Sequence, residues 1–207
     1  RSAGQPSIRH RALPLAISAV LGIGLQTTAV AQAFPAVIEL AELAGSNGFV
    51  LIGETADDYS GRSVASAGDV NGDGIVDLIV GAPYADLNGN EWVGRSYVVF
   101  GSATGLPNPF NLSSLDGSNG FILNGEAAYD RSGLSVAGTG DVNGDGLDDL
   151  IIGAPYADTN GKASAGRSYV VFGSATGLPS PFNLSSLNGS NGFVLNGEVA
   201  LDFSGVS

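Results

Sequence analysis

The sequence predicts an all-β protein built from the four-stranded blades of a β-propeller, and three observations predict it. Residues 47–118 align with residues 119–190 without a gap and are identical at about three quarters of the positions, and self-similarity at a fixed period marks a repeat architecture. Each repeat contains short β-like runs separated by turn residues and has no helical periodicity. One run in each repeat is apolar on both faces, as a strand buried between stacked sheets requires.

Each repeat is expected to form four strands. In the first repeat and just beyond it these are residues 63–67, 78–81, 95–100 and 121–123, and in the second 135–139, 150–153, 167–172 and 193–195. Pro83 and Pro155 suit the end of the second strand, because proline cannot donate to a β-ladder. A segment rich in Gly, Pro, Asn and Ser separates the third strand from the fourth, and we expect it to be a loop.

The third strand distinguishes the propeller from other repeat folds. Tyr97 and Val99 should point to one face of the sheet, and Val98 and Phe100 to the other. A β-sandwich would leave one of these faces polar, and the repeat is long for the coil of a β-solenoid. The pattern therefore favours blades that stack on both faces.

The chain also contains parts of repeats on either side of the two complete ones. A third copy opens at Asn191 and stops at Ser207, and the chain begins with Arg1 rather than Met. We therefore expect a fragment with two complete blades and the start of a third (residues 191–207), whose ring does not close within this chain. Residues 49–52 lack the earlier strands of a blade, so we expect them to act as an outer strand.

Residues 1–33 predict a secretory signal peptide. Arg9, His10 and Arg11 form a positive start, residues 12–25 are mostly apolar, and residues 31–33 (Ala-Gln-Ala) give a small-residue cleavage site. The apolar run is too short for a membrane span, which needs about 20 residues. The protein is therefore expected to be secreted or held at the cell surface, with residues 34–46 as a linker before the repeats.

Composition excludes several functions. The formal net charge is −12 and residues 1–33 contain no acid, so the remainder is more acidic still. This charge disfavours nucleic acid and anionic membranes as partners. There is no Cys, and the one His lies in the predicted signal peptide. Disulfides, Ser-His-Asp and Cys-His catalysis and nitrogen or sulfur ligands for zinc are thus all excluded from the repeats, and we expect a non-enzymatic protein.

Each repeat carries one Asp-rich loop, residues 69–77 and 141–149. Oxygen-bearing side chains stand at loop positions 1, 3, 5 and 9, position 7 can offer its backbone carbonyl, and Gly fills positions 4 and 6. Gly allows the tight turns that such a loop needs. All-oxygen ligands in a flexible loop suit Ca²⁺ better than Mg²⁺, which demands stricter geometry. The spacing therefore predicts two calcium sites.

Two other interpretations of this loop are weaker. An EF-hand needs a bidentate Glu at position 12 and flanking helices, whereas Val80 and Ile152 stand there between strand-like flanks. A plain Asx/Gly turn gives no reason for oxygen-bearing side chains, three of them acids, at four set spacings. The remaining loop acids are expected to be solvated: Asp57, Asp58, Asp86 and Asp158.

The order of these pieces resembles the FG-GAP repeat of the integrin α-subunit β-propeller, most closely in its secreted bacterial form. The resemblance covers residues 47–207 and is carried by the Asp-rich loop, by Gly-Ala-Pro at 81–83 and 153–155, and by Tyr-Val-Val-Phe-Gly at 97–101 and 169–173. One departure is the aromatic residue before the first strand, which is Tyr59 in the first repeat and Phe203 in the third, but Arg131 in the second.

The resemblance implies a seven-bladed propeller with Ca²⁺ in the loop between the first two strands of a blade. By position, the implied ligands are Asp69, Asn71, Asp73, the Ile75 carbonyl and Asp77, and in the second repeat Asp141, Asn143, Asp145, the Leu147 carbonyl and Asp149.

The sequence thus predicts a secreted or cell-surface calcium-binding module for adhesion or protein interaction. Its ligand would be a protein or a surface glycan, with no nucleic acid partner and no membrane insertion after signal cleavage. Loops that differ between the repeats, such as the one with Trp92, are the expected contact regions, while Arg95 and Arg167 are expected either to pair with an acid or to contact ligand. The alternative is a non-catalytic scaffold or substrate-binding part of a larger secreted hydrolase.

Overall fold

A computed structural model describes residues 37, 39–45 and 47–207. These belong to one compact unit, Ala36–Ser207. The predicted signal peptide lies outside the described residues, as do residues 34–36, 38 and 46 of the predicted linker. In the described part of the chain no helix is long and apolar enough to cross a membrane. Helical structure there is limited to 3₁₀ turns, the first of which is η1 (Leu40–Glu42).

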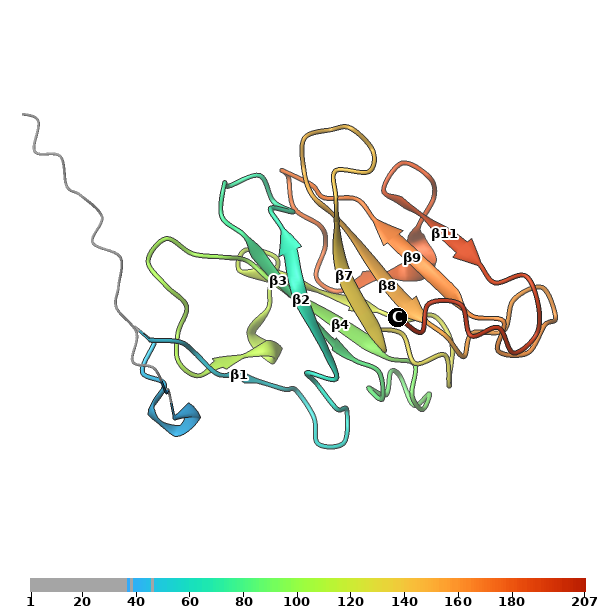
Figure 1. Cartoon of the computed structure of the whole chain (residues 1–207), viewed down its shortest axis with the longest axis horizontal. Helices are drawn as coiled ribbons and strands as arrows, with labels where there is room; N and C mark the ends of the chain where they lie inside the picture. The colour runs from blue at the N-terminus through green and yellow to red at the C-terminus, as the bar shows by residue number, and fades with distance from the viewer. Residues whose placement is uncertain (1–36, 38, 46) are drawn as a thin grey trace, which may run out of the picture. The chain divides into compact units, whose positions relative to one another are not determined.

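The described chain is all-β and forms two four-stranded antiparallel blades. Blade 1 has the strand order β2-β3-β4-β6 and blade 2 the order β7-β8-β9-β11 (Figure 1). The strands of blade 1 are β2 (Ser63–Gly68), β3 (Asp77–Ala82), β4 (Arg95–Val99) and β6 (Gly120–Asn124). Those of blade 2 are β7 (Ser135–Gly140), β8 (Asp149–Ala154), β9 (Arg167–Val171) and β11 (Gly192–Asn196). All eight predicted strands are confirmed, with ends that differ by one residue at most positions.

The segment expected to be a loop contains a further short strand in each blade. In blade 1 this is β5 (Phe110–Asn111) with the turn η2 (Leu112–Ser114), and in blade 2 β10 (Phe182–Asn183) with η3 (Leu184–Ser186). β10 pairs in parallel with β6, so that Phe182 lies opposite Leu123. We call this pairing the latch, because it ties each blade to the outer strand of the blade before it.

The strand at the start of the described chain takes part in an equivalent latch. The strand β1 (Leu51–Ile52) pairs in parallel with β5, with Leu51 opposite Phe110. β1 therefore holds the place that β6 holds beside β10. The pairing agrees with the expectation that residues 49–52 act as an outer strand, but the blade to which they would belong is not among the described residues, so this stays a prediction.

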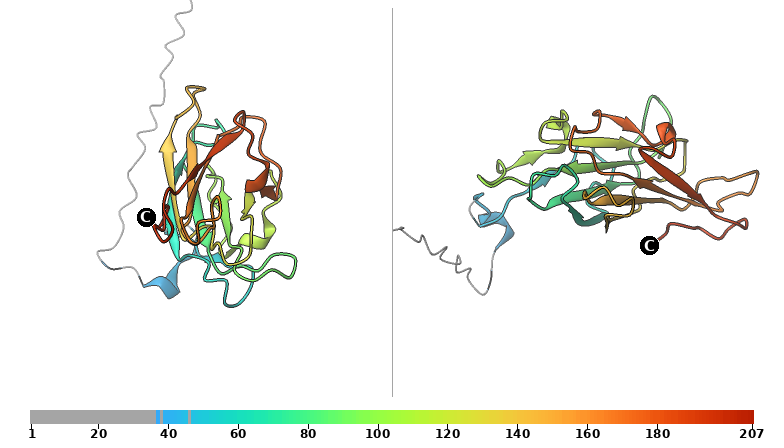
Figure 2. Two further views of the ribbon diagram at one scale, coloured as in Figure 1. Left: turned by 90° about the vertical axis from the view of Figure 1, so that its right-hand side faces the viewer. Right: turned by 90° about the horizontal axis from the view of Figure 1, so that it is seen from above.

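The core lies between the blades, which stack face to face along β2 and β7 (Figure 2). From blade 1, Ile79, Val98 and Leu123 are fully buried against Ile152 and Tyr169 of blade 2. A second cluster covers the other face of blade 1 and contains Tyr97 and Val99, packed against the β5–η2 segment. The predicted alternation of the third strand is therefore confirmed, because its residues enter separate cores on opposite faces.

The strand order puts the connecting loops at two opposite rims. Loops 69–76 and 141–148 leave the first strand of each blade, at the upper end in Figure 1. Loops 83–94, 125–134 and 155–166 lie at the other end, where the Gly94 carbonyl accepts the Gly125 amide at 2.9 Å. We call the end with loops 69–76 and 141–148 the acidic rim, and the end with loops 83–94, 125–134 and 155–166 the aromatic rim.

Candidate functional site

The first Asp of each acidic loop organises the loop backbone. Asp69 Oδ1 accepts hydrogen bonds from the amides of Gly72 at 2.7 Å and Asp73 at 3.1 Å, and Oδ2 accepts one from Gly74 at 2.8 Å. Asp141 makes the same three contacts at 2.7, 3.0 and 2.8 Å. The Asp side chain thus caps amides that a tight turn leaves without partners.

The middle of the loop is a pair of Asx turns. Asn71 Oδ1 accepts the Asp73 amide at 2.9 Å, and Asp73 Oδ1 accepts the Ile75 amide at 2.8 Å. The second loop repeats these contacts through Asn143 and Asp145, both at 2.9 Å. These short polar side chains fold the backbone around themselves, so most of the side-chain hydrogen bonds of the loop are local.

The last Asp of each loop opens the second strand and is fully buried. Asp77 accepts the amides of Val70 at 3.0 Å and Gly101 at 2.8 Å. Burial raises the pKa of the Asp77 carboxyl to about 6; the two amides lower it, and the nearby carboxylates of Asp73 and Asp69 raise it. Asp149 is bound in the same way by two amides, each at 2.9 Å.

The donor chemistry of the loop fits a hard cation. Its side chains offer only oxygen to an ion, and the carboxylates of Asp69 and Asp73 lie close enough to raise the pKa of Asp77, so a positive charge would stabilise the loop. Among the described residues, however, no three His, Cys, Asp or Glu side chains converge at metal-binding distance. The loop carboxylates instead accept amides of their own backbone, so cation binding remains a prediction.

One residue that the sequence analysis missed joins the two loops. Asp148 Oδ2 accepts the Asp69 amide at 2.7 Å, and the Asp148 amide donates to the Asp69 carbonyl at 3.1 Å. The first repeat has Val76 at this position. The loops differ at only two positions, Ile75/Leu147 and Val76/Asp148, and the second of these differences was the only signal in the sequence.

On the aromatic rim, the two Arg residues that open the third strands pair with acids. Arg95 lies 2.7 Å from Glu54, and Arg167 pairs with Glu126 in the same way. The expectation of an acid partner is confirmed. The Tyr97 hydroxyl also donates to Glu54 at 3.0 Å.

The expectation that Asp58 is solvated is wrong. Asp58 is only 6% exposed, because the rim loops fold over it. Burial raises the pKa of its carboxyl, and Arg95 lowers it. Asp130, its counterpart in the next repeat, is equally buried and its pKa is raised to about 6. Asp57, Asp86 and Asp158 are exposed, as expected.

Arg131 takes the place of an aromatic ring. Its guanidinium lies 4.2 Å from the ring centre of Tyr156, 4.9 Å from that of Trp92 and 5.1 Å from that of Tyr84. A cation over a ring face is attracted by the ring's electrostatic quadrupole. Arg131 therefore packs on Tyr156 as Tyr59 packs on Tyr84 one repeat earlier. It completes a continuous row of stacked groups.

This row extends through edge-to-face ring pairs. Tyr84 contacts Trp92 and Trp92 contacts Tyr129, both at 5.6 Å between ring centres. Trp92 is 39% exposed and Tyr129 is 53% exposed. We call the row the aromatic ladder; its members are Tyr59, Tyr84, Trp92, Tyr129, Arg131, Tyr156 and Phe203.

Antiparallel four-stranded blades that stack face to face define the chain as part of a β-propeller. The family model described as "FG-GAP repeat" matches residues 60–99 and 132–171. The chain thus carries FG-GAP repeats of the integrin alpha type.

Similar proteins include integrin alpha chains and a phospholipase. Integrin alpha-IIb of Homo sapiens is 36% identical over 168 residues, 75% of this chain and 15% of that protein. Phosphatidylinositol-glycan-specific phospholipase D of Rattus norvegicus is 39% identical over 114 residues, 55% of this chain and 13% of that protein. Integrin alpha-PS2 of Drosophila melanogaster is 36% identical over 136 residues, 64% of this chain and 9% of that protein. The chain therefore spans a small part of each relative.

Proposed function

We propose that the chain is a secreted or cell-surface, calcium-binding propeller module for adhesion or protein interaction. The observation that carries the proposal is the pair of all-oxygen loops, alike in their internal hydrogen bonds and joined through Asp148. The resemblance to integrin alpha chains supports the adhesive part.

The residues that would hold calcium are the ten predicted from the sequence. In the first loop these are Asp69, Asn71, Asp73, the Ile75 carbonyl and Asp77, and in the second Asp141, Asn143, Asp145, the Leu147 carbonyl and Asp149. When bound, calcium would neutralise the carboxylates and cross-link the loop. To bind it, Asp73 and Asp145 would turn an oxygen from the loop amides toward the ion, while Asp77 and Asp149 already sit fixed at the start of the second strand.

In this proposal the loops set the geometry and other surfaces bind the partner. The acidic rim is stiffened where first and second strands meet, so the blade angle is fixed on that side. The aromatic rim then presents its loops from a rigid support, which is how binding loops on propellers and other scaffolds operate. Its partner would be a protein or a surface glycan.

A calcium titration by calorimetry on the full chain tests the metal sites. We expect two sites per chain, one lost in Asp73→Ala and the other in Asp145→Ala, and a higher melting temperature in calcium than in chelator. Asp116→Asn, an exposed acid that is Asn188 in the second repeat, is the matched control and should keep both sites. A folded chain that binds no calcium would reduce both loops to structural turns.

Export is tested separately, by N-terminal sequencing of protein recovered from the medium or cell surface. Cleavage after Ala33 predicts Phe34 as the first residue. Retention inside the cell with an intact Arg1 end would contradict the predicted signal peptide.

The phospholipase D relatives favour a second candidate, a non-catalytic scaffold or substrate-binding part of a secreted hydrolase. Both candidates assign no catalysis to these repeats. Hydrolysis of a phospholipid or glycoside substrate by the purified chain, retained in the Asp73→Ala/Asp145→Ala double variant, would contradict both.

A further inference from the structure

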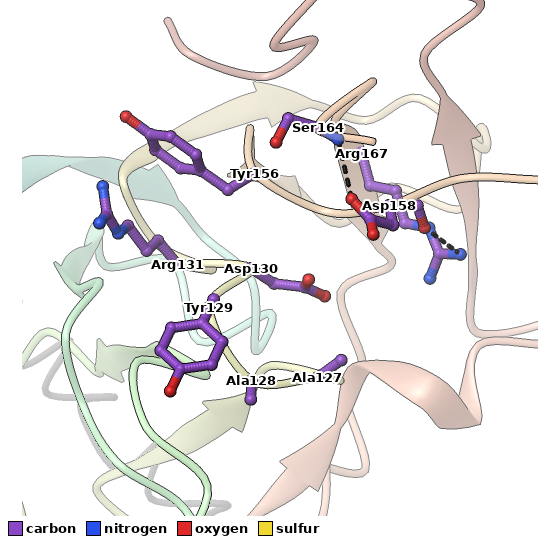
Figure 3. A pocket seen from close by; sticks show the side chains of 9 residues that line it. All are labelled: Ala127, Ala128, Tyr129, Asp130, Arg131, Tyr156, Asp158, Ser164 and Arg167. Carbon is purple, nitrogen blue, oxygen red and sulfur yellow. Dashed lines mark hydrogen bonds between the residues drawn. The ribbon is translucent and has the colours of Figure 1, made fainter. Parts of the chain in front are cut away.

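Two hollows on the aromatic rim are lined by the aromatic ladder. One, the Tyr156 pocket, has a volume of about 430 Å³. In Figure 3 the Asp130 side chain points toward Asp158 and Arg167, whereas Tyr129 and Arg131 of the same loop point to the other side. The other, the Trp92 pocket, has about 360 Å³ and is lined by Asp57, Tyr59, Arg62, Tyr84 and Trp92. Both volumes lie within the range of small-molecule sites.

The linings of both pockets carry carboxylates and guanidinium groups in equal number, although the chain has a net charge of −12. The Trp92 pocket has one carboxylate, Asp57, and one guanidinium, Arg62. The Tyr156 pocket is lined by two of each, Asp130 and Asp158 against Arg131 and Arg167, and Arg167 is also paired with Glu126. A lining of both signs suits a neutral ligand with many hydroxyl groups, since carboxylates accept and guanidinium groups donate hydrogen bonds.

The side chains in the pockets are held in unusual backbone conformations. Asp57, Tyr59 and Trp92 have φ of 68°, 55° and 51°, and Tyr129 and Arg131 have φ of 68° and 54°. Six of the ten described non-glycine residues with positive φ line these pockets, the sixth being Ser164. Strain of this kind is found preferentially at ligand sites, where it aims side chains.

The two repeats differ most on this rim. About half of the differences between residues 47–118 and 119–190 fall in the loops that line the pockets, which make up under a third of each repeat. Asp57 corresponds to Tyr129, and Trp92 corresponds to Ser164. Since the left-handed conformation is the same at each such pair, the fold does not require the differences. They give each pocket its own lining, as subsites for different parts of one ligand require.

We propose that the Tyr156 and Trp92 pockets are adjoining subsites for a neutral carbohydrate. Sugar rings carry C–H groups on one face that pack on aromatic rings, whose faces are electron-rich. Their hydroxyl groups would bond to the balanced acids and guanidinium groups. Asp130 is 6% exposed and lines the Tyr156 pocket, so it offers a desolvated acceptor there. Arg131 lies over both Trp92 and Tyr156 and links the subsites.

This proposal deepens the proposed function, because it names the partner of the rim that the metal loops would support. Affinity electrophoresis of the full chain tests it with four neutral probes: a β-1,3-glucan, an α-mannan, a xylan and chitohexaose. Heparin and poly-lysine are the charged probes. We expect at least one neutral glycan to bind, with little dependence on salt.

The variants are Trp92→Ser, which places the residue of the second repeat at a position that already accepts Ser, and Tyr156→Ala. Each should weaken glycan binding about three- to tenfold through loss of a ring contact. Asp116→Asn should not change it. Binding to none of the four glycans, binding unaffected by both ring variants, or salt-sensitive binding to a charged probe alone would overturn the proposal.

The calcium titration separates this proposal from the proposed function. Both ring variants should keep two calcium sites, because the pockets lie on the opposite rim. If the chain binds calcium but no neutral glycan, the carbohydrate assignment fails and the metal assignment stands. If the parent chain binds a neutral glycan but no calcium, the metal assignment fails and the carbohydrate assignment stands.

Discussion

The link between the acidic loops makes a quantitative prediction for Asp148→Val, which gives the second loop the residue of the first. The variant loses the 2.7 Å hydrogen bond from the Asp69 amide but keeps the backbone bond between the same residues. A hydrogen bond to a charged group contributes about 1.5–3 kcal/mol, and a buried amide left without a partner costs about 1–3 kcal/mol. Asp148 is only half-buried and lies among other acids, which lowers the net effect. We expect a loss of about 1–2 kcal/mol.

Thermal unfolding followed by circular dichroism, in excess chelator, measures this loss without a contribution from metal. For a chain of this size the melting temperature should fall by roughly 3–6 °C. Val76→Asp is the matched control: the described residues include no earlier loop whose amide it could accept, so its effect should stay within about 0.5 kcal/mol. Equal melting temperatures for Asp148→Val and the parent chain, or an equal loss in both variants, would refute the reasoning.

Two further predictions concern the latch and the aromatic rim. Leu123→Ala should lower the free energy of unfolding by about 2–5 kcal/mol, because Leu123 is fully buried and lies opposite Phe182 in the latch. Leu195→Ala, the same position one repeat later at 49% exposure, should lower it by under about 1 kcal/mol. Urea unfolding of both variants checks this, and equal losses would contradict it. Burial raises the pKa of Asp130 to about 6; Arg167 lowers this pKa, and Glu126 and Asp158 raise it. A raised carboxyl pKa adds stability below about pH 4 that is lost as the pH rises through 6, so the urea midpoint should fall over this range in the parent chain and fall less in Asp130→Asn; identical profiles would show that Asp130 is not the cause.

The strands of the blades could be predicted because their signal is local. Alternating and doubly apolar runs such as residues 95–100 fix which side chains face each way, and the repeat confirms each run a second time. The latch strands could not be predicted in this way. Phe182 pairs with Leu123, far away in the sequence, and a two-residue strand within a Gly, Pro, Asn and Ser segment leaves no periodicity to detect.

The same division applies to the candidate site. The acidic loops were predicted because residues 69–77 bond almost entirely to themselves. Asp148 and the buried Asp58 were missed because each depends on a neighbouring segment: Asp148 bonds to another blade, and Asp58 is covered by rim loops. Arg131 looked like a departure from an aromatic position, yet a guanidinium stacks on rings as a ring does.

The latch puts the repeat of the sequence and the blade of the structure out of phase. Residues 47–118 contain an outer strand that precedes blade 1 and lack the outer strand of blade 1 itself, β6. A tandem duplication of any 72-residue stretch of this array therefore adds one complete blade and recreates the same junction on both sides. Duplication can therefore lengthen the array without a new kind of interface between blades. The exposed loops of each added copy can then change in sequence.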